Sequence, residues 1–210
     1  MSRLTVELLG PFRVSFDGQP VTGLESDKVR ALLAYLAVEA DQPHRREKLV
    51  GLLWPEQPEA AARANLRRAL SNLRRVCGDV QASPPCLRVT RQTVQFDGAS
   101  DAWVDVTAFR AALERGKAAK PDIQQLEEAV ALYRGSFLEG FFVKDSAAFE
   151  DWILLTRERL QRQALEALGD LARHHAQQGD LKRACDYAWR QVELEPWQEK
   201  PYQQLMRMLA

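Results

Sequence analysis

The sequence predicts an α+β protein in which a small β-sheet, three helices and a β-hairpin precede an all-helical region. Apolar and polar residues alternate at the start of the chain, helical periodicity follows up to about residue 77, and nearly everything after Val104 has helical spacing. With 210 residues the chain is long enough for two domains. We expect the first over residues 1–100 and the second over residues 101–210.

The N-terminal strands are predicted by period-two alternation. Residues 4–8 and 12–16 each place apolar side chains at every second position, as in strands that are buried on one face. Gly10-Pro11 separates the two runs, and Asp17-Gly18 ends the second with residues typical of hairpin turns. Two half-buried strands are therefore expected.

Three helices follow. We expect Asp27 to be the N-cap of the first, Pro55 to end the short second helix, and the third to span about residues 59–77 before Gly78. Their apolar stripes are Val29, Leu32, Leu33 and Leu36 in the first helix and Leu49, Leu52 and Leu53 in the second.

A hairpin is predicted after the third helix. Residues 87–89 and 94–96 are short alternating runs joined by a turn from Thr90 to Thr93. The order of sheet, three helices and hairpin is that of a winged helix-turn-helix with an additional N-terminal sheet.

The second half of the chain has helical spacing. Helices are expected around residues 123–133, over residues 146–178 as one long or two stacked helices, over residues 181–194, and from residue 198 onward. Because the last segment is still amphipathic at Ala210, we expect the natural protein to continue and this domain to be truncated.

The third helix carries the most informative pattern. At 100° per residue, one arc is apolar and the opposite arc is rich in arginine. A basic helix face is often only a solvated face, but the position before a hairpin favours a helix that enters the major groove. Arginine can pair with guanine and asparagine with adenine. The candidate DNA-reading residues are Arg63, Arg67, Arg68, Ser71, Asn72, Arg74 and Arg75.

The charge distribution agrees with nucleic-acid contact. The net charge is zero, but residues 1–100 contain 14 basic and 11 acidic residues, whereas residues 101–210 contain 15 and 18. A single basic residue outside the third helix is more often a solvent-exposed side chain without a function. Several of them together, however, are expected to contact DNA phosphates. The candidate DNA-backbone contacts are His44, Arg45, Arg46 and Lys48, expected at the start of the second helix, and Arg88 and Arg91, expected on the hairpin.

Other classes of function find little support. No nucleophile-elbow, zinc-protease, P-loop or Cys-x-x-Cys pattern occurs, so we predict no catalytic residues, no metal site, no cofactor and no enzymatic activity. The three cysteines follow no zinc-ligand spacing. Apolar runs are too short for a membrane helix and the N-terminus lacks a signal-peptide core, so a cytoplasmic location is expected.

The chain resembles bacterial activators of the antibiotic-regulatory type. Residues 8–14 (LLGPFRV), residues 49–55 (LVGLLWP) and residues 65–75 (NLRRALSNLRR) are similar to their OmpR-type winged helix. Val104-Asp105-Val106, residues 132–138 (LYRGSFL) and residues 157–160 (RERL) are similar to the bacterial transcriptional activator domain that follows it. The resemblance covers essentially the whole chain.

The resemblance implies specific roles. The third helix would be the recognition helix, residues 86–97 the wing, and the second domain a TPR-like helical domain. Operators would be direct repeats of double-stranded DNA on which two or more protomers, as in a homodimer, bind side by side. A loop between the second and third helices would contact RNA polymerase through Trp54, Glu56, Gln57 and Glu59.

One alternative stays open at this point. The TPR-like helices could serve a protein-interaction module whose winged helix does not bind DNA. Salt-dependent binding to duplex DNA separates the two functions, because only phosphate contacts release counterions.

Overall fold

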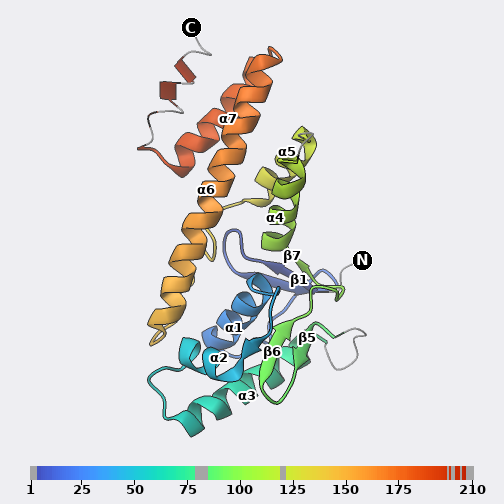
Figure 1. Cartoon of the computed structure of the whole chain (residues 1–210), viewed down its shortest axis with the longest axis vertical. Helices are drawn as coiled ribbons and strands as arrows, with labels where there is room; N and C mark the ends of the chain where they lie inside the picture. The colour runs from blue at the N-terminus through green and yellow to red at the C-terminus, as the bar shows by residue number, and fades with distance from the viewer. Residues whose placement is uncertain are drawn as a thin grey trace. The chain divides into compact units, whose positions relative to one another are not determined.

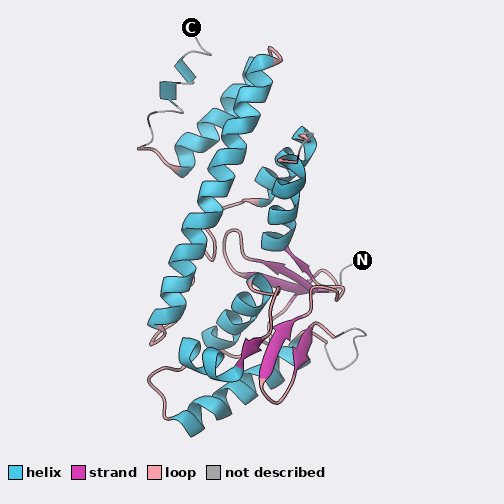
Figure 2. Cartoon of the chain, viewed as in Figure 1, coloured by secondary structure: helices cyan, strands magenta, loops and turns pink. Residues whose placement is uncertain are grey.

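The structure of the chain is a computed structural model. It describes residues 4–78, 85–118, 122–197, 199, 202–203 and 205–206. The chain forms two compact units (Figure 1). Unit 1 comprises Met1–Thr107 and Phe137–Leu155, and unit 2 comprises Ala108–Ser136 and Thr156–Ala210. Helix is found in both units, whereas the strands belong to unit 1 (Figure 2).

The first sheet of unit 1 confirms the predicted N-terminal strands. Strand β1 pairs antiparallel with β2, with Val6 opposite Val14, and parallel with β7. The turn after β2 uses Asp17 and Gly18, both with positive φ, as a tight hairpin requires. The strand order is β3-β2-β1-β7. The strands are β1 (Leu4–Glu7), β2 (Arg13–Phe16), β3 (Gln19–Pro20) and β7 (Trp103–Val104).

Three helices and a second sheet complete the winged helix-turn-helix. Helices α1, α2 and α3 pack against one another, and the apolar stripe of α1 is buried as predicted. The second sheet has the order β4-β6-β5. The helices are α1 (Asp27–Val38), α2 (Arg46–Leu53) and α3 (Glu59–Val76), and the strands are β4 (His44–Arg45), β5 (Leu87–Val89) and β6 (Thr93–Phe96).

Two local predictions were wrong. The N-cap of α1 is Ser26, whose hydroxyl accepts from the Val29 N–H, whereas Asp27 is already in the first turn and pairs with Arg30. His44 and Arg45 do not open the second helix but form β4, paired antiparallel with β6. This strand could not be predicted from the sequence, because it has only two residues and is defined by its pairing with β6, which lies much later in the chain.

A buried carboxylate fixes the end of β1. Both oxygens of Asp105 accept a hydrogen bond from the Leu8 N–H, at 2.9 and 2.8 Å, and one also accepts from the Leu9 N–H at 2.9 Å. Asp105 is fully buried, so these bonds provide the partners that a buried charge needs.

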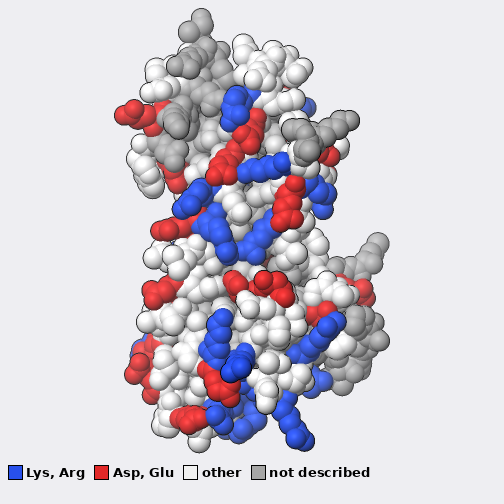
Figure 3. Space-filling view, in the orientation of Figure 1, with Lys and Arg blue, Asp and Glu red and all other residues white. Residues whose placement is uncertain are grey.

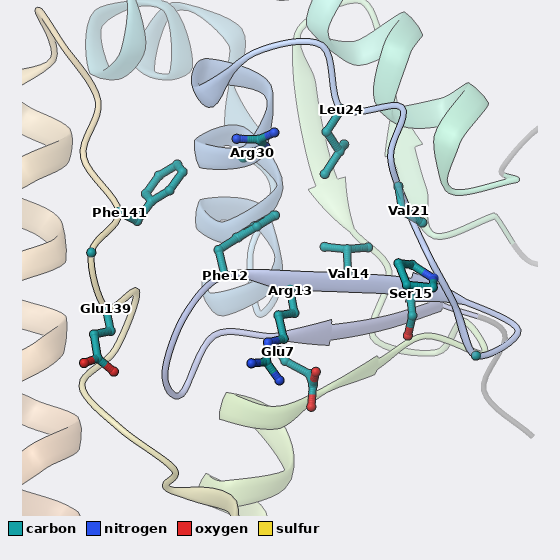
Figure 4. A pocket seen from close by; sticks show the side chains of 13 residues that line it. Glu7, Phe12, Arg13, Val14, Ser15, Val21, Leu24, Arg30, Glu139 and Phe141 are labelled. Carbon is teal, nitrogen blue, oxygen red and sulfur yellow. The ribbon is translucent and has the colours of Figure 1, made fainter.

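The segment 137–155 packs on the same unit. Phe137 bridges to Leu9, and the Phe12 and Phe141 rings stack with their centroids 5.7 Å apart. Phe12 and Phe141 line one pocket of about 680 Å³, together with residues of β1, β2 and α1, and Figure 4 shows the 139–141 segment facing β2 and α1 across it. This segment is therefore part of unit 1.

Unit 2 is helical and contains the predicted TPR-like pair. The side-chain amide of Gln191 donates to the Leu165 carbonyl at 2.9 Å, and that of Gln161 donates to the Leu194 carbonyl at 3.2 Å, which ties α6 to α7. The stretch around residues 146–178 is one helix rather than two. The helices are α4 (Asp105–Gly116), α5 (Ile123–Leu132), α6 (Ala147–Gln177) and α7 (Leu181–Leu194); α4 and α6 begin in unit 1.

A polar cluster links α5 to this pair. His175 Nε2 and the Tyr187 hydroxyl lie 3.1 and 3.3 Å from Glu127 Oε1. Burial raises the pKa of Tyr187, and the Glu127 carboxylate adds to the increase. In addition, Arg190 donates to the Val130 and Tyr133 carbonyls at the end of α5.

One expectation concerns residues outside this description: most of the predicted helix from residue 198 onward lies there. Among the described residues, no helix is long and apolar enough to cross a membrane, and no group of three or more histidine, cysteine or acidic side chains is arranged to hold a metal ion.

Candidate nucleic-acid interface

Helix α3 is held to unit 1 by one apolar face. Its buried side chains include Leu66, Leu70 and Leu73, and it packs against both α1 and α2. Beyond its C-cap, Gly78 adopts a φ of 65°, as the predicted C′ residue should. The opposite face is exposed over 18 helical residues, which is long enough to follow a DNA groove.

The arginines of the exposed face are not equivalent. Arg67 and Arg68 are exposed, and within the described part of the chain they form no ion pair. Arg63 lies between two carboxylates, 2.5 Å from Glu59 and 4.0 Å from Glu47. Glu59, the one acidic residue of α3, therefore lies beside its arginines, and the lower part of Figure 3 shows basic and acidic side chains close together.

Arg75, near the C-terminal end of α3, also has a carboxylate partner. Its guanidinium donates to Glu25 Oε1 at 2.9 Å, and both side chains are largely exposed, at 67% and 63%. Ser71 and Arg74 share the exposed side. The centre of the face, between the two ion pairs, is the part with the most accessible positive charge.

Asn72 does not belong to this face. It is only 3% exposed, its amide donates to the Gly23 carbonyl at 3.0 Å, and its oxygen accepts from the Glu25 N–H at 3.4 Å. The prediction that it reads bases with the arginines was wrong about its exposure. A helical wheel places it on the same side as the arginines, but the loop before α1 covers it there.

The candidate phosphate contacts also include both exposed and buried side chains. Arg45, Lys48 and Arg91 are exposed. His44 is 2% exposed and its Nε2 lies 2.8 Å from the Glu39 carbonyl, so its prediction as an accessible contact was wrong. It faces inward, with its ring centroid 5.1 Å from that of Tyr35 in α1, whereas its neighbour in β4, Arg45, faces outward.

Two further arginines of that set are constrained. Arg88, on the outer side of β5, donates through Nε to the buried Asp97 carboxylate at 2.8 Å, which leaves most of its side chain exposed. Arg46 is half-buried, and its Nε has no hydrogen-bond partner within the described residues.

The loop between α2 and α3 presents polar residues around a buried anchor. Glu56, Gln57 and Glu59 are exposed, but Trp54 is only 6% exposed, so the prediction that it is an accessible contact was wrong. The Ser146 hydroxyl donates to the Leu53 carbonyl at 3.0 Å, which fixes the end of α2 where the loop begins.

A second pocket lies beside the exposed, arginine-bearing face of α3. It has a volume of about 550 Å³ and is lined by Trp54, Asn65, Arg68 and the N-terminal turn of α1. Lys28 also lines it. Burial lowers the pKa of Lys28, and the nearby Asp145 carboxylate partly offsets this effect.

Sequence reasoning missed the acidic partners. Glu25 is 50 positions from Arg75, and Glu47 lies on another helix than Arg63. Neither pairing follows a local period, so no sequence signal pointed to it. The side-chain amide of Asn65 donates to Gln57 Oε1 at 3.3 Å. Asn65 lies within the arginine-rich motif of the third helix, but no function was predicted for it from the sequence.

A comparison with protein families gives a match to the bacterial transcriptional activator domain over residues 104–210. The chain belongs to the bacterial transcriptional activator domain family. Its predicted resemblance to antibiotic-regulatory activators is thereby confirmed, and the family description and the names of the relatives point to a transcriptional regulator rather than an enzyme.

Curated relatives include the transcriptional regulatory protein EmbR of Mycobacterium bovis and of Mycobacterium tuberculosis. Each is 38% identical over 82 residues, which cover 39% of this chain and 21% of the relative. A solved structure of Mycobacterium tuberculosis EmbR, in complex with a low affinity phosphopeptide, matches with a TM-score of 0.74 and 24% identity. That match covers 99% of this chain and 55% of the EmbR chain, and shows that the fold is shared.

The position of the family match adds to the account of unit 1. The activator domain begins at Val104, in strand β7. Its Asp105 binds the end of β1 and its Ser146 binds the end of α2. Residues of the bacterial transcriptional activator domain therefore take part in the unit that carries α3.

Proposed function

We propose that the chain is a sequence-specific, DNA-binding transcriptional regulator whose α3 enters the major groove. The observation that carries the proposal is the exposed pair Arg67 and Arg68, at the centre of a helix whose other face is anchored in the core. Guanidinium groups in this position can pair with guanine edges. Ser71 and Arg74 extend the reading surface, and Arg45, Lys48, Arg88 and Arg91 would contact phosphates.

The proposal extends to assembly on promoters. Two or more protomers would bind direct repeats side by side, as the family resemblance implies. The loop with Glu56, Gln57 and Glu59 would contact RNA polymerase, and its exposed carboxylates suit a basic partner surface. The proposal assigns DNA binding to residues 1–100 and the helical activator domain to residues 101–210; these assignments are functional, because the two compact units divide the chain elsewhere.

Binding to duplex DNA at graded salt concentrations tests the central claim. With about six phosphate contacts, affinity should fall roughly a thousandfold between about 50 and 200 mM salt. A flat response would instead favour an interaction module without DNA binding. Sites selected from random duplexes would then define the sequence preference.

Variants of α3 test the assignment of residues. Two single variants, Arg67→Ala and Arg68→Ala, should each lower the preference for the selected site by about 1–3 kcal/mol per lost base contact. Arg162→Ala, at an exposed position of α6 in unit 2, is the control for the loss of one positive charge. Unchanged preference in the α3 variants would remove both residues from the site.

The polymerase contact is tested separately. Glu56→Lys should reduce transcription from a promoter that carries the selected site while DNA affinity is not reduced, because Glu56 precedes α3 and pairs with none of its arginines within the described residues. Wild-type levels of transcription at full promoter occupancy would argue against this loop as the contact.

A further inference from the structure

The ion pair between Glu25 and Arg75 places a carboxylate on the recognition face. Arg75 lies on the side of α3 opposite its buried leucines, close to Ser71 and Arg68. Its guanidinium donates to Glu25 at 2.9 Å, with both side chains open to solvent. DNA approaching α3 therefore meets Arg75 already engaged with an anion.

Glu25 is held in this place by its own backbone. Its N–H donates to the buried side chain of Asn72 on α3, and the same side chain binds the Gly23 carbonyl. The loop before α1 is thus fastened to α3 on both sides of Leu24, which is itself buried. The backbone of Glu25 is therefore held beside α3, with its carboxylate within reach of Arg75.

We propose that Glu25 is a specificity-determining residue that competes with DNA phosphates for Arg75 and so suppresses non-specific binding. This inference rests on the proposed function of α3. Non-specific binding depends on phosphate contacts alone, and the carboxylate both occupies Arg75 and repels the phosphate backbone. At a specific site, base contacts made by the neighbouring arginines hold α3 and Arg75 can keep its bond to Glu25, so the carboxylate lowers affinity less there.

The energetics suit such a competitor. An ion pair between two exposed side chains contributes little to stability, so the fold does not depend on it and DNA can displace it. Glu25→Gln removes the charge but leaves the backbone N–H that binds Asn72. The variant should therefore fold as the wild type does, which thermal melting followed by circular dichroism verifies.

The test is a double-mutant cycle on a random-sequence duplex and on a selected site. Glu25→Gln should raise affinity for the random duplex roughly three- to tenfold and steepen its salt dependence by about one unit of slope. Affinity for the selected site should rise less, so the ratio of the two affinities falls. In an Arg75→Ala background, Glu25→Gln should produce a much smaller increase.

Glu139→Gln is the matched control. Glu139 is an exposed carboxylate of the same unit that forms no ion pair within the described residues, so it reports the general effect of removing one negative charge. Equal increases for Glu25→Gln and Glu139→Gln, or equal increases with and without Arg75, would overturn the inference alone. A wild-type chain without salt-dependent DNA binding would overturn the proposed function and this inference together.

Discussion

Asp105 shows how one side chain decides the geometry of unit 1. Its carboxylate is fully buried and accepts three hydrogen bonds from two consecutive backbone N–H groups. No local sequence pattern predicts these hydrogen bonds, because the partners of Asp105, Leu8 and Leu9, lie nearly a hundred positions earlier in the chain. The residue closes a loop in the chain that brings β7 beside β1.

The first prediction concerns this carboxylate. Asp105→Asn leaves one acceptor oxygen and turns an amide N–H₂ toward at least the Leu8 N–H, so unfolding free energy should fall by about 1–3 kcal/mol. Urea unfolding followed by tryptophan fluorescence measures it, since Trp54, Trp103 and Trp152 belong to unit 1. Thr107→Ala, at an exposed position, is the control. Equal midpoints for both variants would contradict the role assigned to Asp105.

A second residue-scale prediction separates structure from recognition. Asn72→Ala leaves the Gly23 carbonyl without its donor, so it should lower stability by about 1–3 kcal/mol. The exposed neighbour Ser71, changed to alanine, should alter stability by less than about 0.5 kcal/mol. Compared at equal folded fraction in site selection, Asn72→Ala should keep the wild-type sequence preference. A stable Asn72→Ala variant with altered base preference would return Asn72 to the reading surface.

At the scale of elements, local periodicity was sufficient for the helices and the hairpin. The apolar stripe of α3 and its opposite arginines follow from spacing along one helix, and both were predicted. The burial of His44, Trp54 and Asn72 was not, because it depends on tertiary contacts: the His44 ring packs against Tyr35 of α1, and the Asn72 side chain bonds to the loop before α1. What a residue at a helix border faces depends on its neighbours in space.

The N-cap of α1 is the prediction that belongs to this scale. Because the Ser26 hydroxyl accepts from the Val29 N–H, Ser26→Ala should cost about 0.5–2 kcal/mol of unfolding free energy, whereas Ser26→Asn should be nearly neutral. Thermal melting of the two variants, with wild type beside them, gives the comparison. If alanine and asparagine at position 26 behave alike, the side chain is not a functional cap and the Asp27 alternative regains support.

At the scale of the whole molecule, the sequence suggested a division at residue 100, but the contacts group residues differently. Residues 101–107 and 137–155 belong to the unit that contains the winged helix. Phe137 and Phe149 of the later segment are fully buried, and Trp152 donates to Glu39 at the end of α1. A sequence-based boundary is drawn along the chain, whereas this unit is built from two separate stretches.

Truncation tests the consequence. A fragment of residues 1–100 lacks β7, the Asp105 carboxylate and the Ser146 hydroxyl that binds the end of α2. It should melt at a markedly lower temperature than a fragment of residues 1–155, which retains all of unit 1. Loss of one buried charged acceptor alone costs about 1–3 kcal/mol, and a domain has only about 5–15 kcal/mol to lose. Circular dichroism melting and affinity for a random duplex provide the readouts. If the 1–100 fragment melts cooperatively at the temperature of the longer one and binds DNA equally well, then the winged helix is independent of the activator-domain segment, and the division at residue 100 describes a separate folding unit after all.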